Sequence, residues 1–215
     1  MRKCHLCKIT SRGAIMKITG PEAPFLLKIA AALLAASLII FSTSVSWAQQ
    51  EQAAFRALAS GDSAPDISVV PVAGGAEMLL SFGGGDNSKA PALVWFWFMS
   101  CENCVKDMKF MRDIQKKYKK GIYLFAINVD KPLERAAVKN FVKNNGISGY
   151  QNFFDKITEN TFSVSYDASD KFGINRTPAI FIIDKTGKII FSAENDIDFD
   201  EVEKNIETAI KKRRD

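Results

Sequence analysis

Hydrophobic residues after position 60 follow two different spacings along the chain. The segments 92–98 and 122–129 are almost continuously apolar, as in strands that are buried on both faces of a sheet. The segments 101–118 and 133–144 carry apolar residues at the spacing of a helix that packs on one face. Strand and helix patterns thus alternate, which is typical of an α/β domain.

Shorter patterns complete the predicted element order. Asp184-Lys185-Thr186-Gly187 separates two apolar segments and is a strong hairpin signal. The shorter elements are an N-terminal hairpin at 67–72 and 78–82, a strand at 161–166, a helical turn at 168–172, a second hairpin at 179–183 and 188–191, and a last helix at 199–210. The helix at 101–118 is expected to bury one face, made of Val105, Met108, Met111, Ile114 and Tyr118.

The first 48 residues differ in composition from the rest of the chain. Residues 29–48 carry no charge, basic residues precede them, and Ser46 and Ala48 have the small side chains that signal peptidase requires. We therefore predict a signal peptide at 1–48, a linker at 49–60 and one compact domain at 61–212. The domain would then be extracytoplasmic, in the periplasm or on the outer face of the membrane.

The leader leaves two alternatives open. Its apolar run is nearly as long as the roughly 20 residues that span a bilayer, so an uncleaved signal anchor is the rival interpretation. Polar residues between positions 42 and 46 weaken the end of such a span and favour cleavage. Translation from Met16 instead of Met1 would give a leader of more ordinary length.

Net charge does not indicate a nucleic-acid partner. The chain has 29 basic and 24 acidic residues, a formal charge of +5. The excess lies in the leader, because acidic and basic residues balance after position 48. A basic surface for nucleic acid is therefore not expected on the domain.

Two cysteines, Cys101 and Cys104, lie between the apolar strand at 92–98 and the helix that follows. This order places Cys101 at a helix N-terminus, where unpaired N–H groups and the helix dipole favour a reactive thiolate. Cys104 lies one turn further along, close enough to close a small disulfide. Such a short bridge removes little chain entropy, so the pair indicates a redox centre more than a structural crosslink.

The other candidate chemistry is excluded by what the domain lacks. The remaining cysteines, Cys4 and Cys7, and the one histidine, His5, all lie in the leader. The domain therefore has no histidine for a nucleophilic triad or a metal site. Val105 follows Cys104, so the Cys-x-x-Cys-His signature of covalent haem is missing. We expect no cofactor and no metal.

Three stretches resemble the thioredoxin superfamily, in particular the exported TlpA/ResA-like thiol-disulfide oxidoreductases. They are 61–66, the run 92–104 that ends in Cys-Glu-Asn-Cys, and the tract 170–191 that contains Thr177-Pro178. The similarity covers about residues 61–212. It implies a thioredoxin-like α/β fold, in which helices flank a central mixed sheet and an N-terminal β-hairpin is added. It also implies that Pro178 is a cis proline facing the disulfide.

The chain departs from this family at three positions. Ser100 stands where the family usually has Trp before the first cysteine, and Lys109 stands where a Pro commonly kinks the first helix. Trp95 occupies the strand position at which thioredoxin has a buried Asp. In the ResA-like branch an acidic residue follows the second cysteine by three positions, and Asp107 matches it. The alternative for Asp107 is an ordinary solvated helix residue.

Thiol chemistry gives each site residue an expected role. Cys101 would attack a substrate disulfide, and Cys104 would resolve the mixed disulfide. The charge of Glu102 disfavours the neighbouring thiolate and so favours a reductant, unless Glu102 is only an exposed acid at the helix start. Beside Pro178, the Thr177 backbone is free to pair with an extended substrate strand.

We therefore predict an exported protein-disulfide oxidoreductase that acts as a reductant. Its partners would be proteins with disulfides and a membrane electron donor, and we expect a monomer. The resemblance adds apocytochrome c as a target in cytochrome c maturation. The first alternative is a non-catalytic thioredoxin-fold binding or metallochaperone-like protein, but copper delivery in relatives uses a histidine that is absent here. A peroxidase is the second, although Phe98 replaces the Thr of the peroxiredoxin Thr-x-x-Cys.

Overall fold

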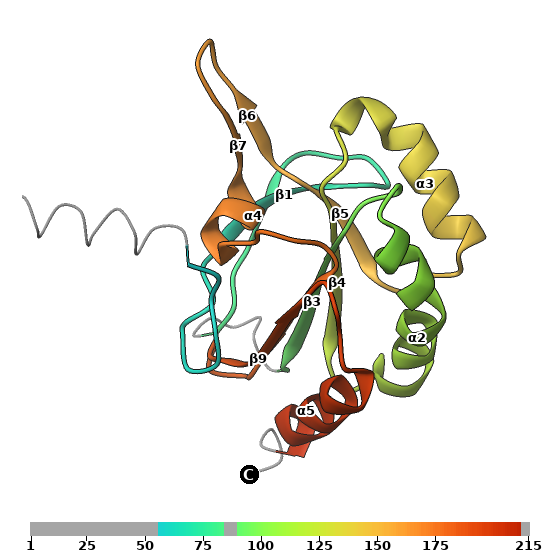
Figure 1. The fold of residues 1–215 in the computed structure, drawn as a ribbon, viewed down its shortest axis with the longest axis vertical. Coiled ribbons are helices and arrows are strands. Elements are labelled where there is room, and N and C mark those ends of the chain that lie inside the picture. Colours follow the sequence, from blue (N-terminus) through green and yellow to red (C-terminus); the bar gives the residue numbers. More distant parts are fainter. Residues whose placement is uncertain (1–55, 84–89, 212–215) are drawn as a thin grey trace, which may run out of the picture. The chain divides into compact units, whose positions relative to one another are not determined.

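A central mixed sheet organises the residues that the computed structural model describes, 56–83 and 90–211. Its seven strands lie in the order β2-β1-β5-β4-β3-β8-β9 (Figure 1). Strand β3 is parallel to β4, and β4 to β5, whereas the other neighbours are antiparallel. The strands are β1 (Ile67–Pro71), β2 (Met78–Leu80), β3 (Ala92–Trp97), β4 (Tyr123–Asn128), β5 (Gln151–Asp155), β8 (Ala179–Ile183) and β9 (Ile189–Glu194).

Helices cover both faces of this sheet (Figure 1). They are α2 (Glu102–Tyr118), α3 (Arg135–Asn144), α4 (Asp167–Phe172) and α5 (Phe199–Lys211), with a short 3-10 helix η1 (Pro132–Glu134). Buried residues of α2, α3 and α5 pack with Trp95 and Trp97 on one face of β3. Phe172 of α4 packs with Phe96 on the other face. All six residues of β3 are buried, because each face of the strand has its own core.

The predicted fold class is confirmed, and so is the N-terminal hairpin, since β1 and β2 pair antiparallel. The expected buried face of α2 was wrong in one position. Val105 is 43% exposed, whereas Cys104 is fully buried and heads a row that continues with Met108 and Met111. Helical geometry turns each residue by about 100°, so Val105 points away from the face that Cys104 shares. The cysteine pair thus belongs to the packed side of the helix.

Two strands escaped the sequence pattern. Strand β5 contains only two buried aromatic residues, Phe153 and Phe154, and begins with polar ones. The segment 161–166 was predicted as one strand, but only Val164–Tyr166 is β7. It pairs with β6 (Ile157–Glu159) in a hairpin that extends away from the main sheet (Figure 1).

The predicted signal peptide at 1–48 lies outside the described residues, as does most of the linker. Within 56–83 and 90–211, no helix is both long and apolar enough to cross a membrane. In the same residues no group of three or more His, Cys, Asp or Glu is placed to hold a metal ion.

Candidate active site

The two cysteines of the domain form a disulfide at the start of α2, directly after β3. Cys101 is the N-cap of this helix: its backbone is extended, and its Sγ accepts a hydrogen bond from the Cys104 N–H at 3.0 Å. A sulfur in this position lies at the positive end of the helix dipole, which stabilises the negative charge of a thiolate. Cys101 keeps 6% of its surface exposed and Cys104 none. Of the two residues, only Cys101 therefore keeps any exposed surface.

The loop before β8 brings Pro178 to the same end of β3. Ala179 pairs with Phe96 near the end of that strand, and the Thr177–Pro178 peptide bond is cis, as the resemblance implied. Thr177 forms no hydrogen bond through its backbone among the described residues. An edge of unpaired N–H and C=O groups is thus available beside the disulfide.

Asn195 joins these two parts of the site, and sequence reasoning missed it. Its N–H donates to the Pro178 carbonyl at 2.7 Å. Its carbonyl and side-chain oxygens lie 3.5 and 3.4 Å from the Asn103 Nδ2. Asn195 has φ +65°, a left-handed conformation that asparagine tolerates better than most residues. No local signal in the sequence marks a contact between residues 92 positions apart.

The end of β4 holds the loop that leads into the cysteines. The Met99 N–H donates to Asp130 Oδ2 at 2.8 Å, and the same oxygen accepts from Asn128 Nδ2 at 2.9 Å. The Asp130 N–H donates in turn to Asn128 Oδ1. Asn128 is fully buried, so this small network fixes the approach to Cys101. Neither residue was predicted as part of the site.

Asp107 lies one helical turn beyond Cys104 and is half-buried. Burial, and secondarily the charge of Asp196, raise the pKa of Asp107 to about 6, while Lys106 opposes this shift. A carboxyl group with such a pKa can exchange protons near neutral pH. Trp95, which stands at the position of the buried thioredoxin acid, is fully buried and stacks on Trp97. Asp107 thus places a half-buried carboxyl group one helical turn from Cys104.

Glu102 is exposed and forms an ion pair with Lys106, with 2.8 Å between the Glu102 Oε1 and the Lys106 Nζ. The hydrogen bond and the charge of Lys106 lower the pKa of Glu102. A paired and solvated carboxylate has a weak field at a distance. Its expected effect on Cys101 therefore stays a prediction, and the structure favours a small one.

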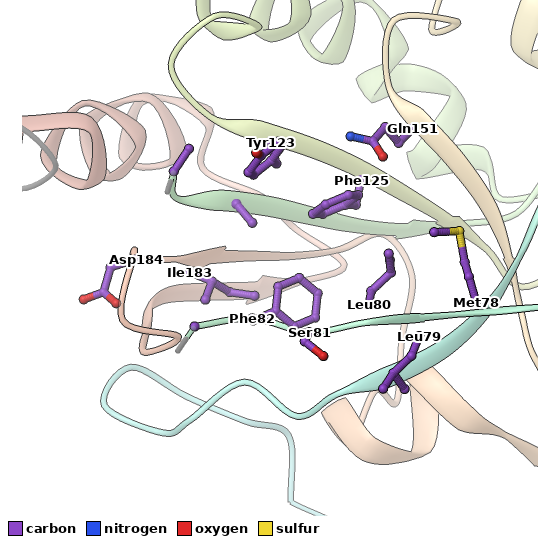
Figure 2. Close-up of a pocket in the computed structure, with 13 residues that line it drawn as sticks. Met78, Leu79, Leu80, Ser81, Phe82, Tyr123, Phe125, Gln151, Ile183 and Asp184 are labelled. Carbon is purple, nitrogen blue, oxygen red and sulfur yellow. The ribbon is translucent and has the colours of Figure 1, made fainter. Parts of the chain in front are cut away.

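A pocket of about 330 Å³ lies at the other end of the sheet. Figure 2 shows Tyr123 and Phe125 of the sheet on one side of it and Leu80 and Phe82 on the other. Tyr123 opens β4, whereas the cysteines follow the last residue of the parallel neighbour β3. The pocket and the disulfide are therefore at opposite ends of the strands. Among the described residues, its lining contains no cysteine, lysine, arginine or histidine.

Comparisons with known proteins show what this chain is similar to. The model of the Redoxin family matches residues 59–210. The thiol-disulfide oxidoreductase ResA of Bacillus thuringiensis (strain Al Hakam) is 33% identical over 100 residues, 44% of this chain and 49% of ResA. ResA of Geobacillus kaustophilus is 24% identical over 157 residues, 71% of this chain and 79% of ResA. The chain thus spans about half the length of the first of these relatives.

Solved structures support the fold alone. A thiol:disulfide interchange protein from Bacteroides sp. superposes with a TM-score of 0.53 at 20% identity. The similarity covers 72% of this chain and 91% of that one. At this identity the match describes the shared α/β architecture, and the chemistry has to be argued from the residues of the site.

Proposed function

Because this chain belongs to the Redoxin family and is TlpA/ResA-like, we propose that it is a thiol-disulfide oxidoreductase acting on protein disulfides. The observation that carries the proposal is the asymmetric pair at the start of α2. Cys101 caps the helix and retains some exposure, while Cys104 is buried behind it. One sulfur is thus built to attack and the other to resolve.

The exchange balances within the two proteins. In the dithiol form, the Cys101 thiolate attacks one sulfur of the substrate disulfide and forms a mixed disulfide, and the other substrate sulfur leaves as a thiolate. The Cys104 thiolate then attacks the Cys101 sulfur and releases the second substrate thiol. Two electrons pass to the substrate, and the Cys101–Cys104 disulfide is restored.

Asp107 is suited to accept the proton of Cys104. It lies three residues beyond Cys104 on the same helix, and its pKa of about 6 leaves it mostly ionised at pH 7. A base on this side is useful because Cys104 has to lose its proton before its sulfur can attack Cys101. Through the same charge, Asp107 disfavours a stable dithiolate and so favours a reducing couple.

Thr177 provides a place for the substrate chain. Its unpaired backbone groups lie beside the buried Pro178, at the end of β3 where the disulfide lies. An extended substrate segment would add to this edge by main-chain hydrogen bonds. Such pairing recognises a backbone and not a particular sequence, which suits an enzyme that acts on disulfides.

The cellular setting follows from the chain's leader and from its chemistry. Export by residues 1–48 would place the domain outside the cytoplasm, where disulfides form. A reductant there consumes its dithiol in each turnover and needs a membrane partner that returns two electrons. The ResA-like resemblance makes apocytochrome c cysteines a target in cytochrome c maturation.

A trapping experiment with two variants tests the assignment of the cysteines. Cys104→Ser should accumulate a covalent complex with a disulfide protein such as insulin, since the mixed disulfide is not resolved. Cys101→Ser should form none, because Cys104 is buried. Ser100→Ala, one residue away and exposed, serves as the matched control with normal turnover. Equal trapping by both cysteine variants, seen on a non-reducing gel, would contradict the proposal.

A further inference from the structure

Asn195 has an unusual backbone conformation beside the candidate active site. Among the described residues it is the one non-glycine residue with a positive φ, +65°. A left-handed backbone costs energy for a residue that carries a side chain, whereas glycine adopts it freely. Such outliers persist where the surrounding structure holds them, and they gather at functional sites. The asparagine side chain is therefore expected to make a contribution here that glycine could not make.

The Asn195 side chain contacts one of the two residues that lie between the cysteines. Its Oδ1 lies 3.4 Å from the Nδ2 of Asn103, and its carbonyl oxygen lies 3.5 Å from the same nitrogen. Asn103 is half-buried, whereas the preceding Glu102 is exposed and pairs with Lys106 on its own helix. Of the two residues between the cysteines, Asn103 is thus the one that contacts a distant part of the chain.

Asn195 is itself held firmly by the sheet. It directly follows β9, which pairs with β8 over its whole length, and its N–H donates to the Pro178 carbonyl at 2.7 Å. A short chain of contacts therefore runs from Pro178 through Asn195 to Asn103, and it ends at the residue directly before Cys104. The first turn of α2 is thus tied to a rigid strand end.

The chain on the other side of Cys101 has a separate anchor. The Met99 N–H donates to Asp130 Oδ2 at 2.8 Å. The backbone is thus fixed two residues before Cys101 by one contact and two residues after it by another, at Asn103. The first contact precedes the attacking sulfur, and the second directly precedes the resolving sulfur. Loss of the second contact should therefore affect the resolving cysteine more than the attacking one.

We propose that Asn195 is a positioning residue for the resolving step of disulfide exchange. Through Asn103 it holds the first turn of α2 so that the Cys104 sulfur can attack the mixed disulfide. The attack needs the reacting sulfur to be correctly placed, and a fixed backbone supplies that placement before the step begins. The inference rests on the proposed function, because a resolving step exists only if Cys101 exchanges with disulfides. It adds a residue that acts through its neighbour and forms no bond to sulfur.

The reaction with dithiobis(nitrobenzoate), an aromatic disulfide, separates the two steps. The full-length protein carries Cys4→Ser and Cys7→Ser, so that its two other sulfurs respond, and it is reduced with dithiothreitol and separated from it. The Cys101 thiolate attacks the reagent, forms a mixed disulfide and releases one thionitrobenzoate. The Cys104 thiolate then attacks the Cys101 sulfur, releases the second thionitrobenzoate and closes the disulfide, so two electrons pass to the reagent. With excess reagent the first release is fast, and stopped-flow absorbance follows the second.

Asn195→Gly should keep the backbone conformation and the hydrogen bond to Pro178, and it removes the side-chain contact. It should slow the second release about fivefold, the loss expected for one hydrogen bond, and leave the first release unchanged. Asn103→Ala should slow the second release at least as much. The double variant should be no slower than Asn103→Ala alone, because the two side chains form one contact. Asn205→Gly, which loses a hydrogen bond to the Glu201 carbonyl on α5, is the control and should keep both rates.

The outcomes separate the positioning role from the reaction itself. An unchanged second release in Asn195→Gly, or an equal slowing of both releases, would overturn the role and leave the proposed function intact. Additive slowing in the double variant would overturn it as well. No second release from the protein in which Asn103 and Asn195 are intact would overturn the proposed function. If Asn195→Gly does not fold, Asn103→Ala decides alone, and a normal second release there counts against the role.

Discussion

Two hollows of similar volume, each about 330 Å³, lie at opposite ends of the central sheet and differ in what surrounds them. The pocket at the start of β3 and β4 is lined by Leu80, Phe82, Tyr123 and Phe125 (Figure 2). The hollow at the other end is a groove lined by Phe98, Val129, Ile174 and Thr177 among others. It borders the disulfide at the N-terminus of α2. Both ends have an apolar hollow. Only one end also has the Cys101–Cys104 disulfide and the positive end of a helix dipole, that of α2.

The difference arises from chain direction. Parallel β3 and β4 end at the same edge, so the loops that follow them meet there, and α2 begins with its N-terminus at this edge. Ligands of open α/β sheets bind at the carboxyl ends of the strands for this reason. At the opposite edge the parallel strands β3, β4 and β5 begin. Among the described residues, no helix as long as α2 starts there after a strand.

The largest expected effect is a difference in disulfide-reducing activity between variants at the two ends of the sheet. Cys101→Ser should abolish reduction of insulin disulfides, because the proposed nucleophile at the N-cap of α2 is lost. Leu79→Ala, at the wall of the distant pocket, should leave the rate unchanged. Turnover of both variants with dithiothreitol as reductant gives the comparison. Comparable losses in the two variants would mean that the distant pocket takes part in the reaction.

A second comparison concerns stability. Met111→Ala should lower the free energy of unfolding by about 2–5 kcal/mol, since Met111 is fully buried on the inner face of α2. Leu79→Ala, at a residue that is 59% exposed, should cost about 0.5 kcal/mol or less. Urea denaturation of the oxidised protein measures both. A larger loss for Leu79→Ala would show that the distant pocket is a structural core.

Asn195 should matter through its backbone conformation. Asn195→Ala places an alanine at φ +65° and should cost about 1–2 kcal/mol of stability. Asn195→Gly tolerates the conformation and loses only the contacts with Asn103. We expect Asn195→Gly to be the more stable of the two, and thermal unfolding decides. The reverse order would mean that the contacts, and not the conformation, hold the two parts of the site together.

Asp107 should produce a pH dependence of stability. Its folded pKa of about 6 lies above 3.8, the ordinary pKa of an aspartate side chain, so the folded state binds the proton more tightly. Stability therefore falls as the pH rises from about 4 to about 6 and is flat above. Asp107→Asn should remove about 1 kcal/mol of this change, a figure reduced because the side chain is only half-buried. Denaturation of both proteins at pH 4 and pH 7 measures it, and parallel curves would contradict the assignment.

Glu102 should give the smallest effect. Glu102→Gln removes a charge that is 84% exposed and paired with Lys106. The neighbouring thiolate should become slightly more stable, and the reduction potential should rise by no more than about 10 mV. Lys109→Gln, an exposed change on the same helix, is the control. A rise of several tens of millivolts would restore Glu102 as the main tuning residue.

The sequence was sufficient for those parts of the fold that have a strong local signal. The continuous apolar run of β3 predicts a strand buried on both faces, and helical spacing predicts α2 to within one residue. Strand β5 escaped because it has only two buried apolar side chains and takes its place through pairing with β1 and β4. Val105 was wrongly assigned to the buried face of α2. The spacing of apolar residues shows that a helix has a buried face, but it does not show which residue lies at the centre of that face.

The candidate site divides in the same way. Cys101 and Cys104 are visible in sequence, since four adjacent residues carry the motif. The groove is not, because Phe98, Val129 and Ile174 come from three distant segments that only the folded chain brings together. The contacts of Asn195 and Asp130 are likewise long-range. The cysteine motif is thus visible in the sequence, whereas the contacts around it depend on the topology of the folded chain.

The reduction potential of the Cys101–Cys104 couple tests the central claim most directly. The protein is equilibrated with mixtures of reduced and oxidised dithiothreitol or glutathione, and the fraction of dithiol is measured by thiol labelling. We predict a reducing couple, closer to thioredoxin at about −270 mV than to a strong oxidant at about −120 mV. A potential near −120 mV, or sulfurs that do not exchange with either buffer, would contradict a reductant at this end of the sheet.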